Sequence, residues 1–582
     1  MFLRTLFTVM IREMRARRHP QVPILLVALC AASALTVAQT RTAPKFYPDD
    51  PIARVVDTQD ASKVEEREIS LYYDAIINLF GRPGKQQVGR AASVNTIDEV
   101  PDSSWFTNRA GTSPLTAADI ARGPDDDRGP APGKWAVSRK AGGASPGFTI
   151  TDPKGNTYFL KFDPPGEPEL GTATEVIVTK LFHALGYHVP QSNIATLNPA
   201  ELVIASNAQA RTRTGGRRPM TQSDIDEQLS RAHRNPDGSY RVVAGSRVQG
   251  RPVEGFKYEG TRSDDPNDVI PHEDRRELRG LRVFSAWLNH TDAKAINSLD
   301  SVVTEGGRSY VKHHLIDFNA ALGSAGIGKR ERRDGYEYLA ETSYAKKALP
   351  SFGLYVRPWM LIDYPEYRGI GRFEAEKFVP EQWRPRVPNP AYVRSRPDDT
   401  FWAARKLMAL TDDLIRAAVR AGQLTDANAE KFLGDALIER RNKIGRAFLT
   451  AVNPIVDPAL TADGALTFKN AAVQHGFAPA PAGYTVIWHQ FDNNTGQAKR
   501  IGETEAKGEQ ARAPEALPSA AGTYLRVDIS ASSPSHPAWS APVHAYFRRG
   551  ASAWTLVAFD RMPDAPPMKP GLVGAELVRV RR

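Results

Sequence analysis

At 582 residues the chain is longer than one hydrophobic core normally supports, so two or three domains are expected. Its 41% hydrophobic and 24% charged residues are typical of a folded globular protein. The net charge is +10, but five arginines against one glutamate place +4 of it before residue 39, and the remaining +6 is too diffuse to indicate a nucleic-acid partner.

The first 38 residues have the order of an export signal. A basic stretch leads into an apolar run at residues 23–39 that ends in small residues, as secretory signal peptides do. The rival interpretation is an uncleaved membrane anchor through residues 22–38, although the run is a little shorter than the roughly 20 residues that a span prefers. In either case we expect an exported protein, which is periplasmic, secreted or anchored to the inner membrane.

Cys30 is the only cysteine and lies in that apolar run. A mature chain without cysteine would have no disulfide, no thiol nucleophile and no cysteine-based zinc site. The sequence also lacks the HExxH motif of zinc proteases. These observations leave a hydrolytic enzyme with little support.

Residues 39–130 are expected to form an irregular N-terminal extension. They combine a helical pattern at residues 64–80 with linkers rich in Pro, Gly and Asp. The pattern changes at residue 131, where three short stretches with strand-like alternation are separated by a Gly-rich turn and a hairpin turn. The predicted strands are residues 134–141, 148–152 and 157–163.

A helix is predicted over residues 172–186, where apolar side chains recur at helical spacing and Gly186 supplies a C-cap. With the three strands it would complete a first lobe at residues 131–199. Residues 200–270 are polar and poor in periodicity, so we expect an insertion there.

Residues 271–452 are expected to form a second lobe, rich in helices. A predicted helix at residues 274–288 is followed by two strands joined by a Gly-Gly turn, and further helices are predicted near residues 401–422 and 426–452. The two predicted strands are residues 300–305 and 308–318.

From residue 453 to the end the pattern is of short strands separated by turn signals, which predicts a β-sandwich. Six aromatic residues here could form a glycan platform, but a sandwich core would explain most of them as well. They are Tyr484, Trp488, Tyr524, Trp539, Tyr546 and Trp554. The expected fold class of the whole chain is α+β.

A polar string follows the apolar end of the helix at residues 274–288. Asp292, Lys294 and Asn297 form the pattern DxKxxN, and the second strand of the hairpin ends in Ile-Asp-Phe with Asp317 at its centre. Asp and Asn are common turn formers, and by composition alone DxKxxN should occur in roughly one chain in a dozen of this length. Followed by a hairpin and a second aspartate, it indicates a site.

The order of these features resembles the protein-kinase-like superfamily. The shared features are a three-stranded meander with a Gly-rich first turn, a lysine in the third strand, an acid in the next helix, DxKxxN and Ile-Asp-Phe. The likeness covers about residues 131–450 and is closest to the HipA-type and type II phosphatidylinositol 4-kinase branches. It implies a bilobal core and an ATP- and Mg²⁺-dependent phosphotransferase, whose acceptor is an unidentified protein, lipid or glycan.

The resemblance implies a role for each polar residue of the string. Asp292 would accept a proton from the acceptor hydroxyl or orient it, and Lys294 would sit beside the transferring phosphoryl group. Asn297 and Asp317 would bind Mg²⁺, which prefers hard oxygen ligands.

Lys161 and Glu175 would serve the nucleotide. Lys161 lies on the opposite side of its strand from Leu160 and Phe162 and could reach the α- and β-phosphates, or be a solvated strand lysine. Glu175 shares an apolar helical stripe and needs a partner such as Lys161. However, residues 172–175 also fit a capping box, in which Glu175 would only satisfy the first turn of the helix.

Gly142 and Gly143 of the first turn would bring backbone amides to the phosphates. Their segment departs from the protein-kinase GxGxxG pattern, and Pro146 removes one N–H donor. His290-Thr291 stands where protein kinases have His-Arg, which puts regulation by activation-loop phosphorylation in doubt.

The second hypothesis is a non-catalytic envelope protein that uses a kinase-like scaffold and a β-sandwich to bind a partner or glycan. Export favours it, because ATP is scarce outside the cytoplasm. The presence of Asp292, Asn297 and Asp317 counts against it, since a binding module has no need of a base and two metal ligands.

Overall fold

The structure is a computed structural model that describes residues 43–70, 72–80, 88–126, 129–140, 145–212, 216–340, 349–350 and 354–563. It divides into a small unit, residues 1–45 with 492–497, and a large unit that holds the rest of the chain and every element named below. The predicted export signal at residues 1–38 lies outside the described residues, as do Gly142 and Gly143. In the part of the chain that is described, no helix is both long and apolar enough to span a bilayer.

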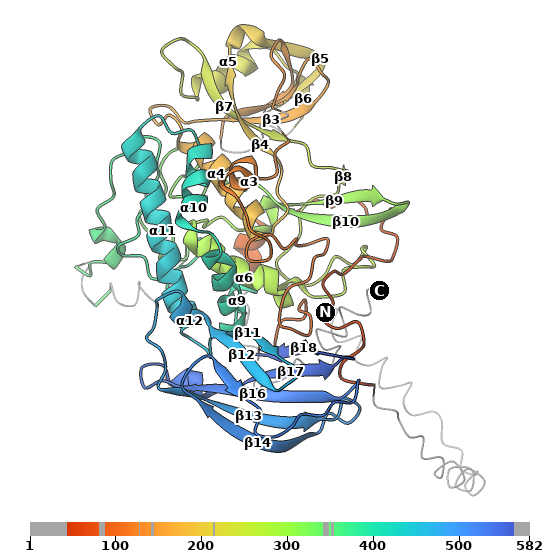
Figure 1. The fold of residues 1–582 in the computed structure, drawn as a ribbon. Helices are drawn as coiled ribbons and strands as arrows, with labels where there is room; N and C mark the ends of the chain where they lie inside the picture. The colour runs from red at the N-terminus through yellow and green to blue at the C-terminus, as the bar shows by residue number, and fades with distance from the viewer. Residues whose placement is uncertain are drawn as a thin grey trace, which may run out of the picture. The chain divides into compact units, whose positions relative to one another are not determined.

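Seven strands form one mixed sheet in the order β4-β7-β3-β2-β1-β5-β6, at the top of Figure 1. Neighbouring strands are antiparallel except for the parallel pair β1 and β5. The three predicted strands are confirmed as β1 to β3. The bounds are β1 Trp135–Lys140, β2 Gly147–Thr151, β3 Thr157–Phe162, β4 Ser192–Leu197, β5 Leu202–Arg211, β6 Arg217–Pro219 and β7 Tyr240–Ser246.

The segment at residues 200–270, expected to be an insertion, has regular structure that its polar sequence did not indicate. It supplies β5, β6 and β7 to the same sheet, together with helix α5 (Gln222–Ser230). The strands β5 and β6 lie at the edge of the sheet with most of their side chains at least partly exposed, so they lack the alternation that marks a half-buried strand.

Strand β3 separates two hydrophobic clusters. Tyr158, Leu160 and Phe162 are buried in the cluster that also contains Ile225 of α5. Lys161 points to the opposite face, as the period of two predicts. Helix α4 (Leu170–Leu185) packs against β3, β4 and β7, and most of its apolar residues belong to the other cluster. Lys161 therefore faces α4.

The helices of the second half share this other cluster with α4. Helix α6 confirms the predicted helix at residues 274–288, and it packs against α8, α9 and α11 (Figure 1). Their bounds are α6 Arg276–Trp287, α8 Pro390–Val393, α9 Pro397–Met408, α10 Asp412–Ala421 and α11 Ala427–Leu449.

The predicted hairpin is confirmed between α6 and these later helices. Strand β9 (Ser298–Glu305) pairs antiparallel with β10 (Arg308–Leu315), and the short β8 (Arg251–Pro252) pairs with β9. Gly306 and Gly307 make the two-residue turn with φ of 58° and 77°, values that glycine adopts without strain.

The N-terminal extension has little regular structure. The predicted helix at residues 64–80 is much shorter than expected: in the described part of that segment, two α-helical residues, 73 and 74, lead into a π-helix at Ala75–Phe80. A second short helix, α3, spans Ala117–Arg122. The extension nevertheless packs into the large unit, since Arg276 of α6 is fully buried and its guanidinium lies 2.7 Å from Asp98.

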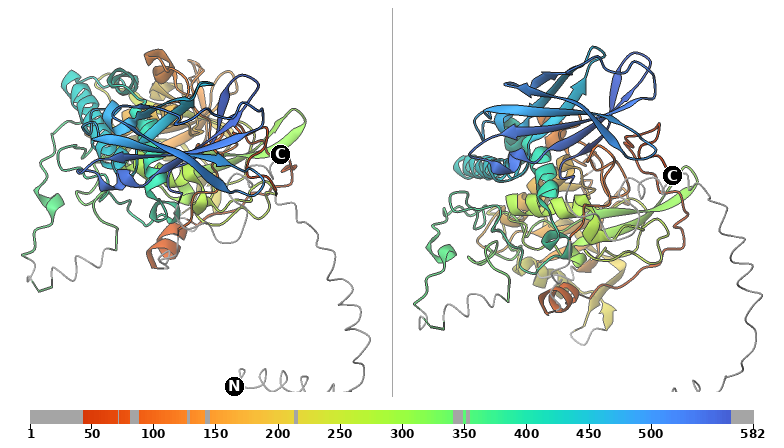
Figure 2. Two further views of the ribbon diagram at one scale, coloured as in Figure 1. Left: turned by 60° about the horizontal axis from the view of Figure 1, so that its bottom comes forward. Right: turned by 90° about the horizontal axis from the view of Figure 1, so that it is seen from below.

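The C-terminal strands form two antiparallel sheets, β11-β12-β15 and β14-β13-β16-β17-β18 (Figure 2). The predicted short strands are present; that the two sheets form a β-sandwich stays a prediction. Of the six aromatic residues considered as a glycan platform, all but Tyr524 are buried, which favours a core role. The bounds are β11 Ile455–Leu460, β12 Ala465–Asn470, α12 Ala471–Gln474, β13 Gly483–Phe491, β14 Ala498–Ala506, β15 Gln510–Arg512, β16 Tyr524–Ser532, β17 Val543–Arg549 and β18 Trp554–Asp560.

Gly186 ends α4 with a φ of 117°, and a Cβ at this position would overlap the ring of Phe106. We expect Gly186→Ala to lower the thermal midpoint more than Gly155→Ala, whose φ is 84° but whose Cβ would meet no described atom within 4 Å. Backbone strain costs about 1 kcal/mol in both, and the overlap adds about 1–3 kcal/mol in the first. Equal midpoints for the two variants would contradict the close packing of Phe106 on α4.

Candidate functional site

Lys161 joins three parts of the chain. Its Nζ donates to Glu175 Oε2 at 3.0 Å and to Asp317 Oδ1 at 2.8 Å. Glu175 lies in α4 and is 6% exposed, whereas Asp317 follows β10 and is 43% exposed. Burial alone would lower the pKa of Lys161, but the two carboxylates outweigh burial and raise it above its usual value. The ammonium is therefore charged at neutral pH and holds the sheet, α4 and the end of the hairpin together.

Glu175 does not cap its helix. Helix α4 begins at Leu170, and the hydroxyl of Thr172 donates instead to Asp163 Oδ2 at 2.8 Å. The capping-box hypothesis is wrong, because the helix starts before the residues that would form the box. Glu175 Oε2 also accepts from the backbone N–H of Asn319 at 2.8 Å, which binds α4 to the segment that follows Asp317.

Asp292, Lys294 and Asn297 form a second group of contacts. Lys294 Nζ lies 2.5 Å from Asp292 Oδ1, and Asn297 Nδ2 donates to the backbone oxygen and to Oδ2 of Asp292 at 2.8 and 3.2 Å. Burial acts to raise the pKa of Asp292, but Lys294 and Arg330 lower it to about 2. The carboxylate is thus ionised at neutral pH, and the two bonds through Nδ2 do not engage the amide oxygen of Asn297.

The two groups adjoin through the backbone. The N–H of Ile316 donates to the carbonyl oxygen of Asn297 at 3.1 Å, which places the end of the polar string beside the residue before Asp317. Asp317 has a φ of 65°, a left-handed conformation that costs a non-glycine residue of order 1 kcal/mol. All the predicted site residues that the structure describes therefore come together in one region.

The end of the Gly-rich turn reaches the same region. Ser145 Oγ donates to the carbonyl oxygen of Gly326 and accepts from Asn319 Nδ2, both at 3.2 Å. Gly147 is the first residue of β2, and its backbone N–H donates to Gln228 Oε1 at 3.3 Å, so this amide is not available to a ligand.

Residues 143–147 also spell GxSxG, the pattern of a hydrolase nucleophile elbow. In that elbow the serine sits between a strand and a helix. Ser145 lies instead between two paired strands, β1 and β2. Ser145 therefore does not occupy the strand-to-helix position that an elbow requires.

His290 is buried beneath the string. Its ring packs edge-on against Phe182 of α4 and Phe318, with centroids 5.9 and 5.8 Å away. Burial lowers the pKa of His290 to about 4, so the imidazole is neutral at pH 7. This aromatic contact links α4 to both polar groups.

Asp74 is a supporting residue that the sequence did not indicate. Its Oδ2 accepts from the backbone N–H of Ala295 at 2.9 Å, and its Oδ1 accepts from Asn78 Nδ2 at 3.0 Å. Burial raises the pKa of Asp74. Ala295 begins the 3-10 turn that ends at Asn297, so the N-terminal extension supports the polar string from 221 residues away.

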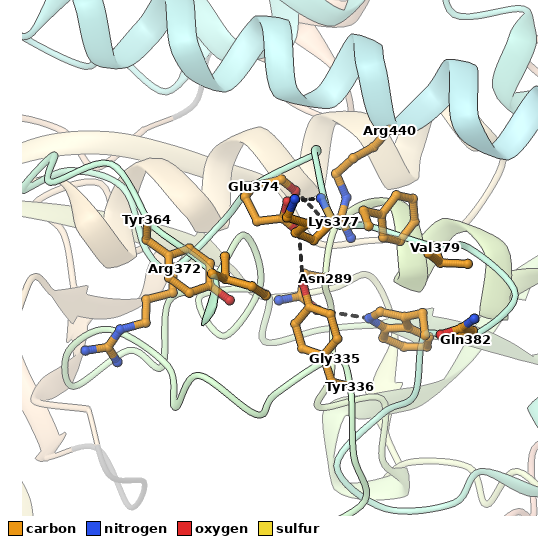
Figure 3. Close-up of a pocket in the computed structure, with 13 residues that line it drawn as sticks. Asn289, Gly335, Tyr336, Tyr364, Arg372, Glu374, Lys377, Val379, Gln382 and Arg440 are labelled. Carbon is orange, nitrogen blue, oxygen red and sulfur yellow. Dashed lines mark hydrogen bonds between the residues drawn. The ribbon is translucent and has the colours of Figure 1, made fainter. Parts of the chain in front are cut away.

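A cavity of about 220 Å³ lies beside the start of the string and is lined in part by Asn289 (Figure 3). Polar groups in its wall bond to one another. Trp383 Nε1 donates to Asn289 Oδ1 at 2.9 Å, and the Tyr336 hydroxyl donates to Glu374 Oε1 at 2.8 Å. Because these groups are paired, the cavity does not by itself indicate a ligand.

No family model matches the sequence, and no curated protein matches it significantly. Solved structures that are similar to it include protein kinases. A proinflammatory kinase of Helicobacter pylori, CtkA, is 13% identical with a TM-score of 0.28, over 54% of this chain and 95% of that chain. A Golgi casein kinase is 10% identical with a TM-score of 0.28, over 54% and 74%. The Rio2 kinase of Chaetomium thermophilum, in a complex with ADP/Mg²⁺ and phosphoaspartate, is 14% identical with a TM-score of 0.21, over 53% and 72%. At such TM-scores these likenesses carry no argument, and the function has to be argued from the site itself.

Because His290 is neutral in the folded protein, the stability of the fold should depend on pH. A free histidine takes up a proton near pH 6.5 and His290 only near pH 4, so the protein loses stability as the pH falls from 6.5 to 4. We expect the free energy of unfolding of His290→Phe to fall by about 2–4 kcal/mol less than that of the wild type over this pH range, because phenylalanine keeps the ring contacts and does not titrate. Denaturant unfolding of both proteins at pH 7 and pH 4.5 measures this difference, and parallel pH profiles would refute it.

Proposed function

We propose that the protein is an exported, ATP- and Mg²⁺-dependent phosphotransferase of the protein-kinase-like superfamily. The contact of Lys161 with Glu175 and Asp317 is the observation that carries the proposal. In protein kinases a lysine on the third strand pairs with a glutamate of the next helix, and an asparagine and then an aspartate further along bind the metal. Lys161, Glu175, Asn297 and Asp317 occur in that order on corresponding elements.

Lys161 and Glu175 would bind and orient the nucleotide. The Lys161 side chain is 27% exposed, so phosphate oxygens could reach it, and its bond to Glu175 would hold it in place while they do. Asp317 would then exchange its bond to Lys161 for a metal. Gly142 and Gly143 would offer backbone N–H groups to the phosphates, and the side chain of Ser145, which follows them in the chain, contacts Asn319.

The donor atoms present fit a magnesium ion. Asp317 offers a partly exposed carboxylate and Asn297 an amide oxygen, both of the hard type that Mg²⁺ prefers. No group of three or more His, Cys, Asp or Glu side chains suited to a metal occurs in the described ranges, and a site of two protein ligands completed by phosphates and water does not need one. Bound magnesium would neutralise charge on the β- and γ-phosphates.

Asp292 would position the acceptor hydroxyl. Because its pKa is about 2, it is ionised and accepts a hydrogen bond from that hydroxyl, but it is too weak a base to hold the proton before transfer begins. Lys294, which contacts Asp292, would place a positive charge next to the transferring phosphoryl group.

The finer assignments belong to the same proposal. They are a bilobal core, a C-terminal β-sandwich, the HipA-type or type II phosphatidylinositol 4-kinase-like branch, and export to the periplasm or beyond. The cluster on the α5 side of the seven-stranded sheet supports the first of these, because it is separate from the cluster that α4 shares with the later helices. The acceptor, whether protein, lipid or glycan, is unassigned.

One observation favours the alternative, a non-catalytic envelope scaffold. Lys161 bonds directly to Asp317, so the carboxylate that would bind the metal is already paired. A kinase-like fold that has lost its activity could use such a closed pair for stability alone. Nucleotide binding separates the two hypotheses.

We expect the protein to bind ATP in a Mg²⁺-dependent manner and Asp317→Asn to weaken that binding about tenfold or more, because the variant loses a charged metal ligand. Calorimetry of the full chain with and without Mg²⁺ measures the effect. Asp413→Asn, which removes an exposed carboxylate from the first turn of α10, is the matched control and should bind as the wild type does. Absence of nucleotide binding by the wild type with Mg²⁺ or Mn²⁺ would leave the scaffold hypothesis in its place.

We also expect Asp292→Asn to keep nucleotide affinity while it slows phosphoryl transfer by about 10²–10⁴-fold, the usual contribution of a positioned base. Transfer to water, followed as Mg²⁺-ATP hydrolysis, provides an assay that needs no known acceptor. A variant that hydrolyses ATP as fast as the wild type would remove Asp292 from the mechanism.

A further inference from the structure

Three charged side chains next to Asp292 are tightly packed but poorly bonded. Arg330 and Asp334 are 6% and 3% exposed, and Arg386 is partly buried. Within the described structure, Nε of each arginine and Oδ2 of Asp334 are buried and make no hydrogen bond. The closest charged atoms of Arg330 and Asp334, and of Arg386 and Asp334, are 3.8 Å apart, which is too far for a hydrogen bond. Buried charged groups normally have hydrogen-bond partners, so this group calls for an explanation.

The backbone fixes both arginines beside the string. The N–H of Arg386 donates to the carbonyl oxygen of Thr291 at 3.0 Å, and the N–H of Arg330 donates to that of Gly323 at 2.8 Å. A guanidinium nitrogen of Arg330 lies 3.8 Å from Asp292 Oδ2. The hydroxyl of Thr291 is also buried without a hydrogen-bond partner in the described structure. Arg330 thus adjoins the string through Asp292, and Arg386 adjoins it through the backbone of Thr291.

The surroundings are strongly basic. Four of the five residues at 329–333 are Lys or Arg, and Arg384 and Arg386 flank Pro385. Burial lowers the pKa of Arg330 and raises that of Asp334, so neither charge is well solvated. A pair of guanidinium groups with spare N–H donors is suited to an oxyanion, which accepts charge-assisted hydrogen bonds from planar donors.

We propose that Arg330 and Arg386, spaced by Asp334, bind an oxyanion of the acceptor next to Asp292. The acceptor is then an alcohol that also carries a phosphate or carboxylate group. That the bound molecule is the phosphate acceptor rests on the proposed function, whereas the oxyanion site itself rests on the geometry of these three residues. The competing explanation is that ordered water molecules bridge the gaps of 3.8 Å and the group is purely structural.

The test uses the full chain without nucleotide and inorganic phosphate as the probe. We expect phosphate to raise the thermal midpoint of the wild type beyond the effect of chloride at equal ionic strength, and Arg386→Gln to weaken the apparent phosphate affinity about tenfold or more. Arg384→Gln is the matched control. It removes the same charge two residues before Arg386, and the guanidinium of Arg384 lies over the Tyr338 ring. Acetate titrations separate the two sources, since a carboxylate site responds to acetate and a phosphate site responds mainly to phosphate.

Two results would overturn the inference. If phosphate and acetate raise the thermal midpoint of the wild type no more than chloride does, the three side chains form a water-bridged network. If Arg386→Gln and Arg384→Gln weaken the apparent phosphate affinity equally, the effect is general attraction to basic residues. If Arg386→Gln does not fold, Arg330→Lys replaces it, because it keeps the charge but loses the planar fork and should lose the phosphate effect.

Failure of this inference is distinguishable from failure of the proposed function. Arg386→Gln should still bind Mg²⁺-ATP, and Asp317→Asn should still respond to phosphate. A wild type that responds to phosphate but binds no nucleotide loses the kinase function and keeps the oxyanion site. A wild type that binds nucleotide but does not respond to either anion loses the oxyanion site alone.

Discussion

The candidate site depends on the ion pairs that the ammonium group of Lys161 makes with Glu175 and Asp317. Through these two carboxylates the ammonium joins a strand and the helix that follows it to the end of a hairpin 156 residues away. Without it, Glu175 would be a buried carboxylate with only a backbone N–H for a partner, and an unpaired buried charge costs several kcal/mol. The alternation of β3 is what allows this contact, because it turns Lys161 away from the cluster that buries its neighbours.

The polar string from Asp292 to Asn297 is supported from both sides by residues that lie outside DxKxxN and Ile-Asp-Phe. Asp74, from the N-terminal extension, accepts the N–H of Ala295, and Arg330 approaches Asp292 from the segment after the hairpin. The extension is therefore part of the site's framework. This arrangement explains how a short loop between α6 and β9 can hold three polar side chains in fixed positions.

Much of the fold could be predicted from local pattern alone. Strand β3, helix α6 and the β9–β10 hairpin each carry a strong period or a turn signal, and each was predicted within a few residues. The predictions failed where burial did not follow a simple period. Strands β5 and β6 lie at a sheet edge with few buried side chains, and the capping box failed because the start of α4 is set by its contacts with Asp163.

The sequence by itself determined which chemical groups are available and the order in which the chain presents them, from Lys161 and Glu175 to Asn297 and Asp317. Short-range periodicity and turn chemistry are sufficient for that, because they depend on neighbours along the chain. Only the tertiary structure decided that Lys161 contacts both carboxylates, that Asp74 supports the string, and that Arg330 and Arg386 lie beside Asp292. Such contacts join residues tens to hundreds of positions apart, and no local pattern records which distant charges will share a buried site.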